Sequence, residues 1–104
     1  MFGFGPKIDV EEIQEELEDG TALLVDVRGD DEWLSGHAVG ALHLSLDRIS
    51  DGDVPTKDTS KKLYVYCASG GRSGVAAQIL KQKGYLVENI GGLSSWRSAG
   101  GAIE

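Results

Sequence analysis

The feature that most constrains the fold is a strand, a small-residue loop and a helix that follow one another over residues 63–83. Residues 63–67 are rich in β-forming side chains and end in a cysteine, and residues 75–83 form an apolar, helix-favouring run. A second apolar run over 22–28 is continuous, which is typical of a parallel strand that is buried on both faces. The two patterns predict an α/β domain with a central, mostly parallel sheet flanked by helices, because parallel strands need crossover connections.

The other predicted elements fit the same α/β pattern. Apolar residues at helical spacing predict a short amphipathic helix over 10–18, with Asp9 as its N-cap and Gly20 at its end. The loop 68–74 leads into the helix over 75–83, for which Ser73 is the predicted N-cap. We also predict strands over 42–44 and 86–90, a polar surface connection over 51–62, a break at Gly91 and Gly92, and a short helix over 93–98.

Length and charge limit the classes of function. A chain of 104 residues is expected to form one domain over 1–104, with about residues 1–6 as a flexible N-terminal segment. The net charge of −7 argues against nucleic acid and against anionic membrane surfaces as partners. Neither a secretory signal nor a membrane-spanning run is recognisable, so we expect a cytoplasmic monomer.

The residue best suited to chemistry is Cys67, which is the only cysteine and therefore has no disulfide or zinc-binding partner of its own kind. It is predicted to lie at the carboxyl end of a parallel strand, where α/β sheets bind ligands. Gly70 and Gly71 permit backbone angles that turn N–H groups toward an anion, and Arg72 adds a positive charge. These donors favour a thiolate with a pKa below roughly 8.5.

An inert, buried cysteine is the alternative interpretation of Cys67. The reactive interpretation requires a thiol that is ionised at neutral pH and open to solvent. Loop length distinguishes sulfur transfer from phosphate chemistry. Four residues separate Cys67 from Arg72, whereas cysteine-dependent phosphatases have five residues between their cysteine and arginine. The shorter ring favours a persulfide sulfur over a tetrahedral phosphoryl group, and the lack of a second cysteine argues against an arsenate reductase with an intramolecular resolving step.

Three motifs, taken in order, resemble the single-domain rhodanese-like (thiosulfate sulfurtransferase) family from about residue 7 to the end of the chain. Residues 24–28, followed by Glu32-Trp33, Gly36-His37 and Gly40-Ala41, resemble its first signature. Residues 67–73 resemble its six-residue active loop and the serine that follows, and residues 91–96 with Gly100 resemble its C-terminal signature. The resemblance implies a rhodanese-like three-layer fold.

The resemblance also implies a sulfurtransferase with a ping-pong mechanism and no metal or organic cofactor. Cys67 would be the nucleophile and sulfur carrier, and Arg72 would orient an anionic donor. The expected small-molecule partners are thiosulfate or a persulfide as donor and cyanide or a thiol as acceptor. The backbone amides of the loop would form the cradle around the sulfur, and they belong to Ala68, Ser69, Gly70, Gly71 and Ser73.

One departure from the family favours a second hypothesis. Ala68 stands where some active members carry arginine, and the predicted helix over 10–18 has a strongly acidic face. A sulfur-carrier or interaction module with little thiosulfate activity of its own, loaded by a protein donor, would fit these two features.

The remaining polar and aromatic residues are expected to be structural. Asp26 and Arg28 could face the edge of the pocket, but an ion pair between Arg28 and Glu32 is the favoured interpretation. His37 is predicted to be a hydrogen-bonded structural residue, and His43 an ordinary strand residue. Trp33 and Trp96 are predicted to pack rather than bind substrate, and a metal site of Cys67, His37 and His43 lacks any known ligand spacing.

Overall fold

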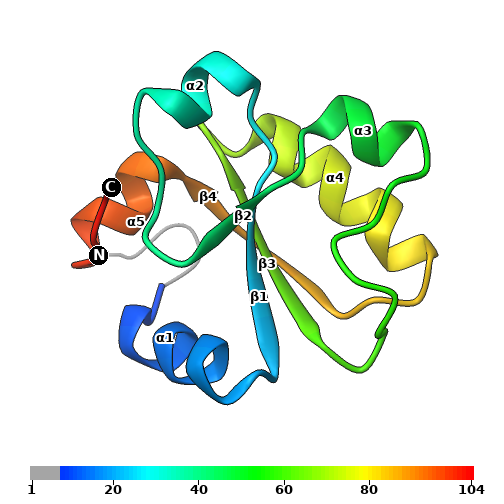
Figure 1. Cartoon of the computed structure of the whole chain (residues 1–104), viewed down its shortest axis with the longest axis horizontal. Coiled ribbons are helices and arrows are strands. Elements are labelled where there is room, and N and C mark those ends of the chain that lie inside the picture. Colours follow the sequence, from blue (N-terminus) through cyan, green and yellow to red (C-terminus); the bar gives the residue numbers. More distant parts are fainter. Residues whose placement is uncertain (1–7) are drawn as a thin grey trace, which may run out of the picture.

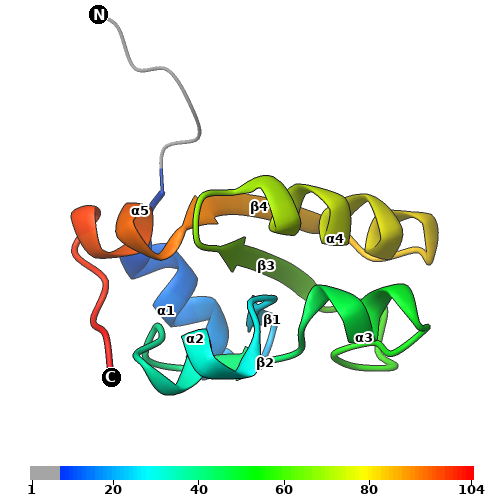
Figure 2. The ribbon, with the colours of Figure 1, turned by 90° about the horizontal axis from the view of Figure 1, so that it is seen from above.

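A four-stranded parallel sheet lies between two layers of helices in the computed structural model, which describes residues 8–104 (Figure 1). Helices α1 and α5 cover one face of the sheet, and α3 and α4 cover the other (Figures 1 and 2). This arrangement confirms the predicted α/β fold with a flanked parallel sheet. The elements are α1 (Val10–Asp19), β1 (Ala22–Asp26), α2 (Asp30–Leu34), β2 (Ala41–His43), α3 (Leu46–Ser50), β3 (Lys62–Cys67), α4 (Gly71–Gln82), β4 (Val87–Gly92) and α5 (Leu93–Ser98).

The sheet places the end of β3 at its centre. The strand order is β2-β1-β3-β4, so β1 and β3 are the inner strands and pair from Ala22↔Lys62 to Asp26↔Tyr66. Strand β3 is buried from Leu63 onward, as its apolar composition predicts. Because all the strands are parallel, their carboxyl ends meet at one edge, and helix α2 lies at that edge (Figure 1).

Each face of the sheet has its own hydrophobic core. On the α3/α4 face, Ile49 and Leu80 are fully buried against Val65 of β3. On the α1/α5 face, Trp96 is fully buried and its indole N–H donates to the carbonyl of Ala102 at 3.0 Å. The predicted packing role of Trp96 is therefore confirmed.

Helix α1 forms as its sequence predicts. The Asp9 side chain accepts a hydrogen bond from the Glu12 backbone N–H at 3.1 Å, and the apolar residues Val10 and Ile13 are buried. The helix ends at Gly20, whose φ of 83° lies in the left-handed region that glycine tolerates.

The structure differs from the predicted boundaries around the central loop. Helix α4 begins at Gly71 instead of residue 75, with Gly70 at its N-cap in a left-handed conformation (φ 101°). Ser73 is therefore inside the helix and is not the N-cap. Strand β4 runs through Gly91 and Gly92, where a break was predicted, and the short helices α2 and α3 were not predicted.

Two further expectations concern the termini and membranes. The flexible segment predicted for residues 1–6 lies outside the described residues. Within residues 8–104, no helix has both the length and the apolar character that crossing a bilayer requires.

A buried polar network ties the end of β1 to β3. The Arg28 guanidinium donates from Nε and Nη2 to the Asp26 carboxylate at 2.8–3.0 Å, and both side chains are nearly inaccessible. The Tyr66 hydroxyl donates to Asp26 Oδ2 at 2.7 Å and accepts from the Ala38 N–H at 3.0 Å. Burial, together with the neighbouring Asp26 carboxylate, raises the pKa of Tyr66, so the phenol remains a donor at all ordinary pH values.

Removing the charge of Asp26 should be much more harmful than removing an exposed carboxylate. We expect Asp26→Asn to lower the free energy of unfolding by about 3–5 kcal/mol, because it leaves the buried Arg28 charge uncompensated. The control is Asp53→Asn, which breaks an exposed pair with Arg48 and should cost less than about 1 kcal/mol. Urea unfolding of the three proteins measures both values, and equal losses would contradict this account of the network.

Candidate active site

Cys67 is the last residue of β3, and a tight loop folds over its sulfur. The residue pairs in register with Gly92 of the neighbouring strand. Ala68 and Ser69 are exposed above it, whereas only 1% of Cys67 itself is exposed. Our expectation of an open thiol was therefore wrong: the sulfur lies on the floor of the loop, and a reacting atom must be small enough to reach it there.

Donors from the loop surround the sulfur. The Gly70 N–H donates to Sγ at 2.9 Å, and the Ser73 hydroxyl lies 3.3 Å from Sγ. Burial raises the pKa of the Cys67 thiol, but the Ser73 hydroxyl and the backbone N–H groups of Ser73, Ser69 and Gly70 lower it. The donors outweigh burial, so the pKa of Cys67 lies below its ordinary value, as the sequence predicted.

Asn89 fixes the positions of these donors, and the sequence analysis missed it. Its Nδ2 donates to the Gly70 carbonyl at 3.0 Å, while its Oδ1 accepts from the Gly91 N–H at 2.9 Å and lies 2.7 Å from the Ser73 hydroxyl. Ser73 has one hydroxyl proton, so it donates either to Asn89 or to the sulfur. A polar residue near the carboxyl end of a strand beside β3 is the signal that could have identified Asn89.

Gly92 allows the loop to approach β4. A Cβ atom at this position would lie 2.2 Å from the Ala68 carbonyl oxygen and 3.3 Å from the Ser69 Cα. No side chain fits in that space, so glycine is required at position 92 for the loop to close over Cys67. This contact gives a structural reason for the second glycine of the Gly-Gly pair, which the sequence analysis placed at a strand break and in the C-terminal signature.

Arg72 forms a bidentate ion pair with Glu32. Its Nη1 and Nη2 donate to the two carboxylate oxygens at 2.7 and 2.8 Å, which joins α4 to α2 across the site. This pair holds the pKa of Glu32 at about 2, and both Glu32 and the Cys67 sulfur raise the pKa of Arg72. Arg72 therefore binds the Glu32 carboxylate and also interacts electrostatically with the Cys67 sulfur.

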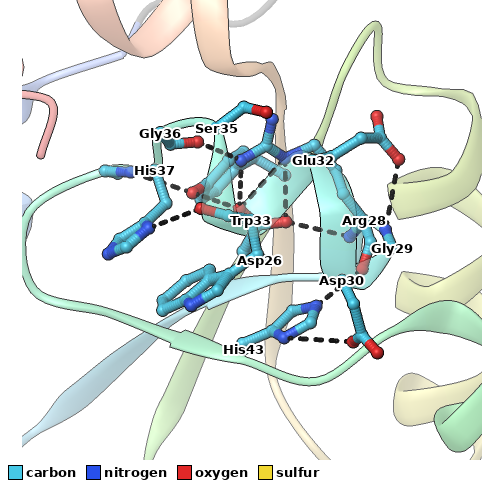
Figure 3. Close-up of polar contacts among 12 residues, drawn as sticks. Asp26, Arg28, Gly29, Asp30, Glu32, Trp33, Ser35, Gly36, His37 and His43 are labelled. Carbon is cyan, nitrogen blue, oxygen red and sulfur yellow. Dashed lines mark hydrogen bonds and ion pairs between the residues drawn. The ribbon is translucent and has the colours of Figure 1, made fainter.

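The predicted ion pair between Arg28 and Glu32 is wrong. Arg28 binds Asp26 instead, and its Nη2 also donates to the Gly36 carbonyl at 2.6 Å (Figure 3). Arg28 lines a cavity of about 390 Å³ beside α5, but Asp26 is fully buried and does not line that cavity. The pair thus braces the start of the α2 segment.

The two histidines stack on opposite sides of Trp33 and serve structure, as predicted for His37. His37 Nδ1 is 2.9 Å from the Trp33 carbonyl, and the two rings stack at 3.5 Å (Figure 3). His43 stacks at 4.9 Å and reaches the Arg28 carbonyl with Nε2 at 2.8 Å, so it does more than occupy a strand. Across the described part of the chain, no three His, Cys, Asp or Glu side chains are grouped to hold a metal ion.

Comparison with known proteins identifies the family and the fold. The sequence profile of the Rhodanese-like domain family matches residues 9–99. The Alr3790 protein of Anabaena sp. is 28% identical with a TM-score of 0.77, over 93% of this chain and 79% of that one. The rhodanese-related protein of Thermoplasma volcanium is 25% identical with a TM-score of 0.75, over 93% and 95%.

A third similar structure contains the fold within a longer chain. The reduced CoADR-RHD protein of Bacillus anthracis is 33% identical with a TM-score of 0.70, over 93% of this chain but only 17% of that one. A domain of this shape therefore also occurs within a much longer chain.

Removing the Ser73 hydroxyl should raise the pKa of the Cys67 thiol. In Ser73→Ala the donor 3.3 Å from the sulfur is lost, so less thiolate is present at neutral pH. We expect alkylation by iodoacetamide to slow at pH 7 and to be nearly unchanged at a pH well above the thiol pKa. Mass spectrometry of Cys67, the only cysteine, measures the rate.

The matched control is Ser69→Ala, which removes an exposed hydroxyl and keeps the backbone N–H that faces the sulfur. This variant should retain the alkylation profile of the unmodified sequence. If both variants shift the profile equally, the Ser73 hydroxyl does not stabilise the thiolate.

Proposed function

Because this chain belongs to the Rhodanese-like domain family, we propose that it is a sulfurtransferase that carries sulfane sulfur as a persulfide on Cys67. The observation that supports this proposal is the ring of donors around a cysteine with a lowered pKa. A thiolate at neutral pH is the form of cysteine that attacks sulfur.

In the first half-reaction, the Cys67 thiolate attacks the sulfane sulfur of a donor. A new S–S bond forms as the bond between the sulfane sulfur and its neighbour breaks, and the leaving group departs with the bonding electron pair. With thiosulfate the leaving group is sulfite. The thiolate is the attacking species, so no proton moves in this step, and the donors that lower the pKa of Cys67 favour that species without a general base.

The persulfide is stabilised by the same groups that stabilise the thiolate. The Gly70 N–H donates to the sulfur, the N–H groups of Ser69 and Ser73 also lower its pKa, and we propose that these groups donate to the negative charge that the outer sulfur carries. The Cys-x4-Arg ring is smaller than the phosphate-binding loop of cysteine phosphatases, which favours this ligand over a phosphoryl group.

In the second half-reaction, an acceptor nucleophile attacks the outer sulfur and regenerates the Cys67 thiolate. A thiolate acceptor leaves as a persulfide, and cyanide leaves as thiocyanate. Since only 1% of Cys67 is exposed, transfer at the outer sulfur suits the site better than direct access to the cysteine. We propose small thiophilic acceptors, or a thiol presented on an extended protein segment.

Thiosulfate or a thiosulfonate should add one sulfur atom to the protein. We expect intact-mass spectrometry, after removal of free donor, to show this adduct on Cys67 and to show its loss when cyanide is added. Thiocyanate should appear in equal amount. Cys67→Ser is the control, because it keeps a small polar side chain on the loop floor but cannot form a persulfide.

The proposal fails if correctly folded, reduced protein gains no sulfur from any donor of these classes. It also fails if the adduct persists in Cys67→Ser.

A further inference from the structure

Arg72 is the one charged side chain among residues 67–73, and it forms an ion pair with Glu32. The guanidinium is held by two short hydrogen bonds to the carboxylate, at 2.7 and 2.8 Å. Glu32 is itself fixed, because its Oε1 accepts from the Gly29 N–H at 3.1 Å. Two parallel N–H···O bonds to an anchored carboxylate form a specific and strong pairing.

The charges around the sulfur therefore sum to a negative value. The thiolate and Glu32 each contribute one negative charge, and Arg72 contributes one positive charge. Glu32 stays ionised under all ordinary conditions, since its pKa is about 2. A donor that approaches Cys67 meets a site in which the arginine charge is already compensated.

We infer that Glu32 determines donor specificity by neutralising Arg72, so that the site prefers sulfur donors with one negative charge or none over dianionic thiosulfate. The preferred class would be thiosulfonates and the persulfides of thiols. This inference rests on the proposed function and concerns the same site. Glu32 is a positioning residue here, because it acts through Arg72.

Thiosulfate and the methanethiosulfonate anion react in the same way but differ in charge, so a comparison of the two donors tests the effect of charge alone. Both present a sulfane sulfur bonded to a sulfonyl sulfur, and in both the thiolate takes the sulfane sulfur while the sulfonyl group leaves with the bonding electrons. Sulfite leaves from the first donor and methanesulfinate from the second. The total charge is conserved in each case, and the two donors differ by one unit of charge.

The experiment compares kcat/KM for these two donors, with cyanide as acceptor, in the unmodified protein and in Glu32→Gln. Glutamine retains an oxygen that can accept from the Gly29 N–H but removes the charge that neutralises Arg72. Removing one unit charge affects a dianion twice as strongly as a monoanion. We expect the ratio of kcat/KM for thiosulfate to that for methanethiosulfonate to rise by about fourfold or more at low salt.

Asp31→Asn is the matched control. Asp31 is an exposed acidic neighbour in the same helix α2, and it makes no ion pair within residues 8–104. Its variant should change the donor ratio by less than about twofold, because Asp31 does not pair with Arg72 and its removal leaves the Arg72–Glu32 pair intact. Glu32→Ala removes the same charge as Glu32→Gln and replaces it if the glutamine variant fails to fold.

The ratio of the two kcat/KM values distinguishes an effect of charge from damage to the structure, because structural damage would lower kcat/KM for both donors together. An unchanged ratio in folded Glu32→Gln and Glu32→Ala, both still loading sulfur on Cys67, would overturn the role of Glu32 and leave the sulfurtransferase proposal standing. A complete lack of loading in the unmodified protein would instead contradict the sulfurtransferase proposal itself.

Discussion

The close approach of β4 to the loop after Cys67 determines what the site can do. The Ala68 carbonyl lies where a side chain at position 92 would project, and Gly70 packs against the backbone of Gly91. This contact holds the loop over the end of β3, where the Gly70 N–H donates to the Cys67 sulfur at 2.9 Å. Glycine at position 92 is therefore a steric condition for the cradle, whereas Gly70 is favoured by its left-handed backbone conformation.

The cradle is also held from the side by polar groups. Asn89 bonds the loop through the Gly70 carbonyl and bonds its own strand through the Gly91 N–H, so the loop and β4 share one anchor. This anchor matters because donors that must reorganise would stabilise an anion less than donors already in place. The buried Cys67 has a lowered pKa only because these fixed donors outweigh the cost of desolvation. Cys67 thus meets one condition of the reactive interpretation, a lowered pKa, while its burial departs from the other, a thiol open to solvent.

The sequence was sufficient to predict the fold class and the position of Cys67 at the carboxyl end of a buried strand. Continuous apolar runs predicted the buried strands β1 and β3, and the small-residue loop after Cys67 predicted a site at the carboxyl edge. The start of α4 was placed too late, because Gly70 and Gly71 read as loop residues and Ser73 as an N-cap. In three dimensions Gly70 takes the left-handed cap conformation, and the Ser73 side chain turns toward the sulfur and Asn89.

The ion-pair partners could not be predicted, because they depend on where helix α2 begins. Arg28 and Glu32 are four residues apart, which would face them toward each other on one helix. Helix α2 begins at Asp30, however, so Arg28 lies in the connection before it and folds back onto Asp26. Glu32 is left on the side of α2 that meets Arg72.

The ion pair between Glu32 and Arg72 links the two halves of the site. Glu32 belongs to the segment after β1 and Arg72 to the helix after β3, and these strands are neighbours in the sheet. The Gly29 N–H also holds the Glu32 carboxylate, so the ion pair with Arg72 costs the Glu32 side chain little additional conformational freedom. The arginine of the loop is consequently oriented by a residue 40 positions away in sequence. The charge beside Cys67 is thus a property of the packing of α2 against α4, and the loop motif alone does not determine it.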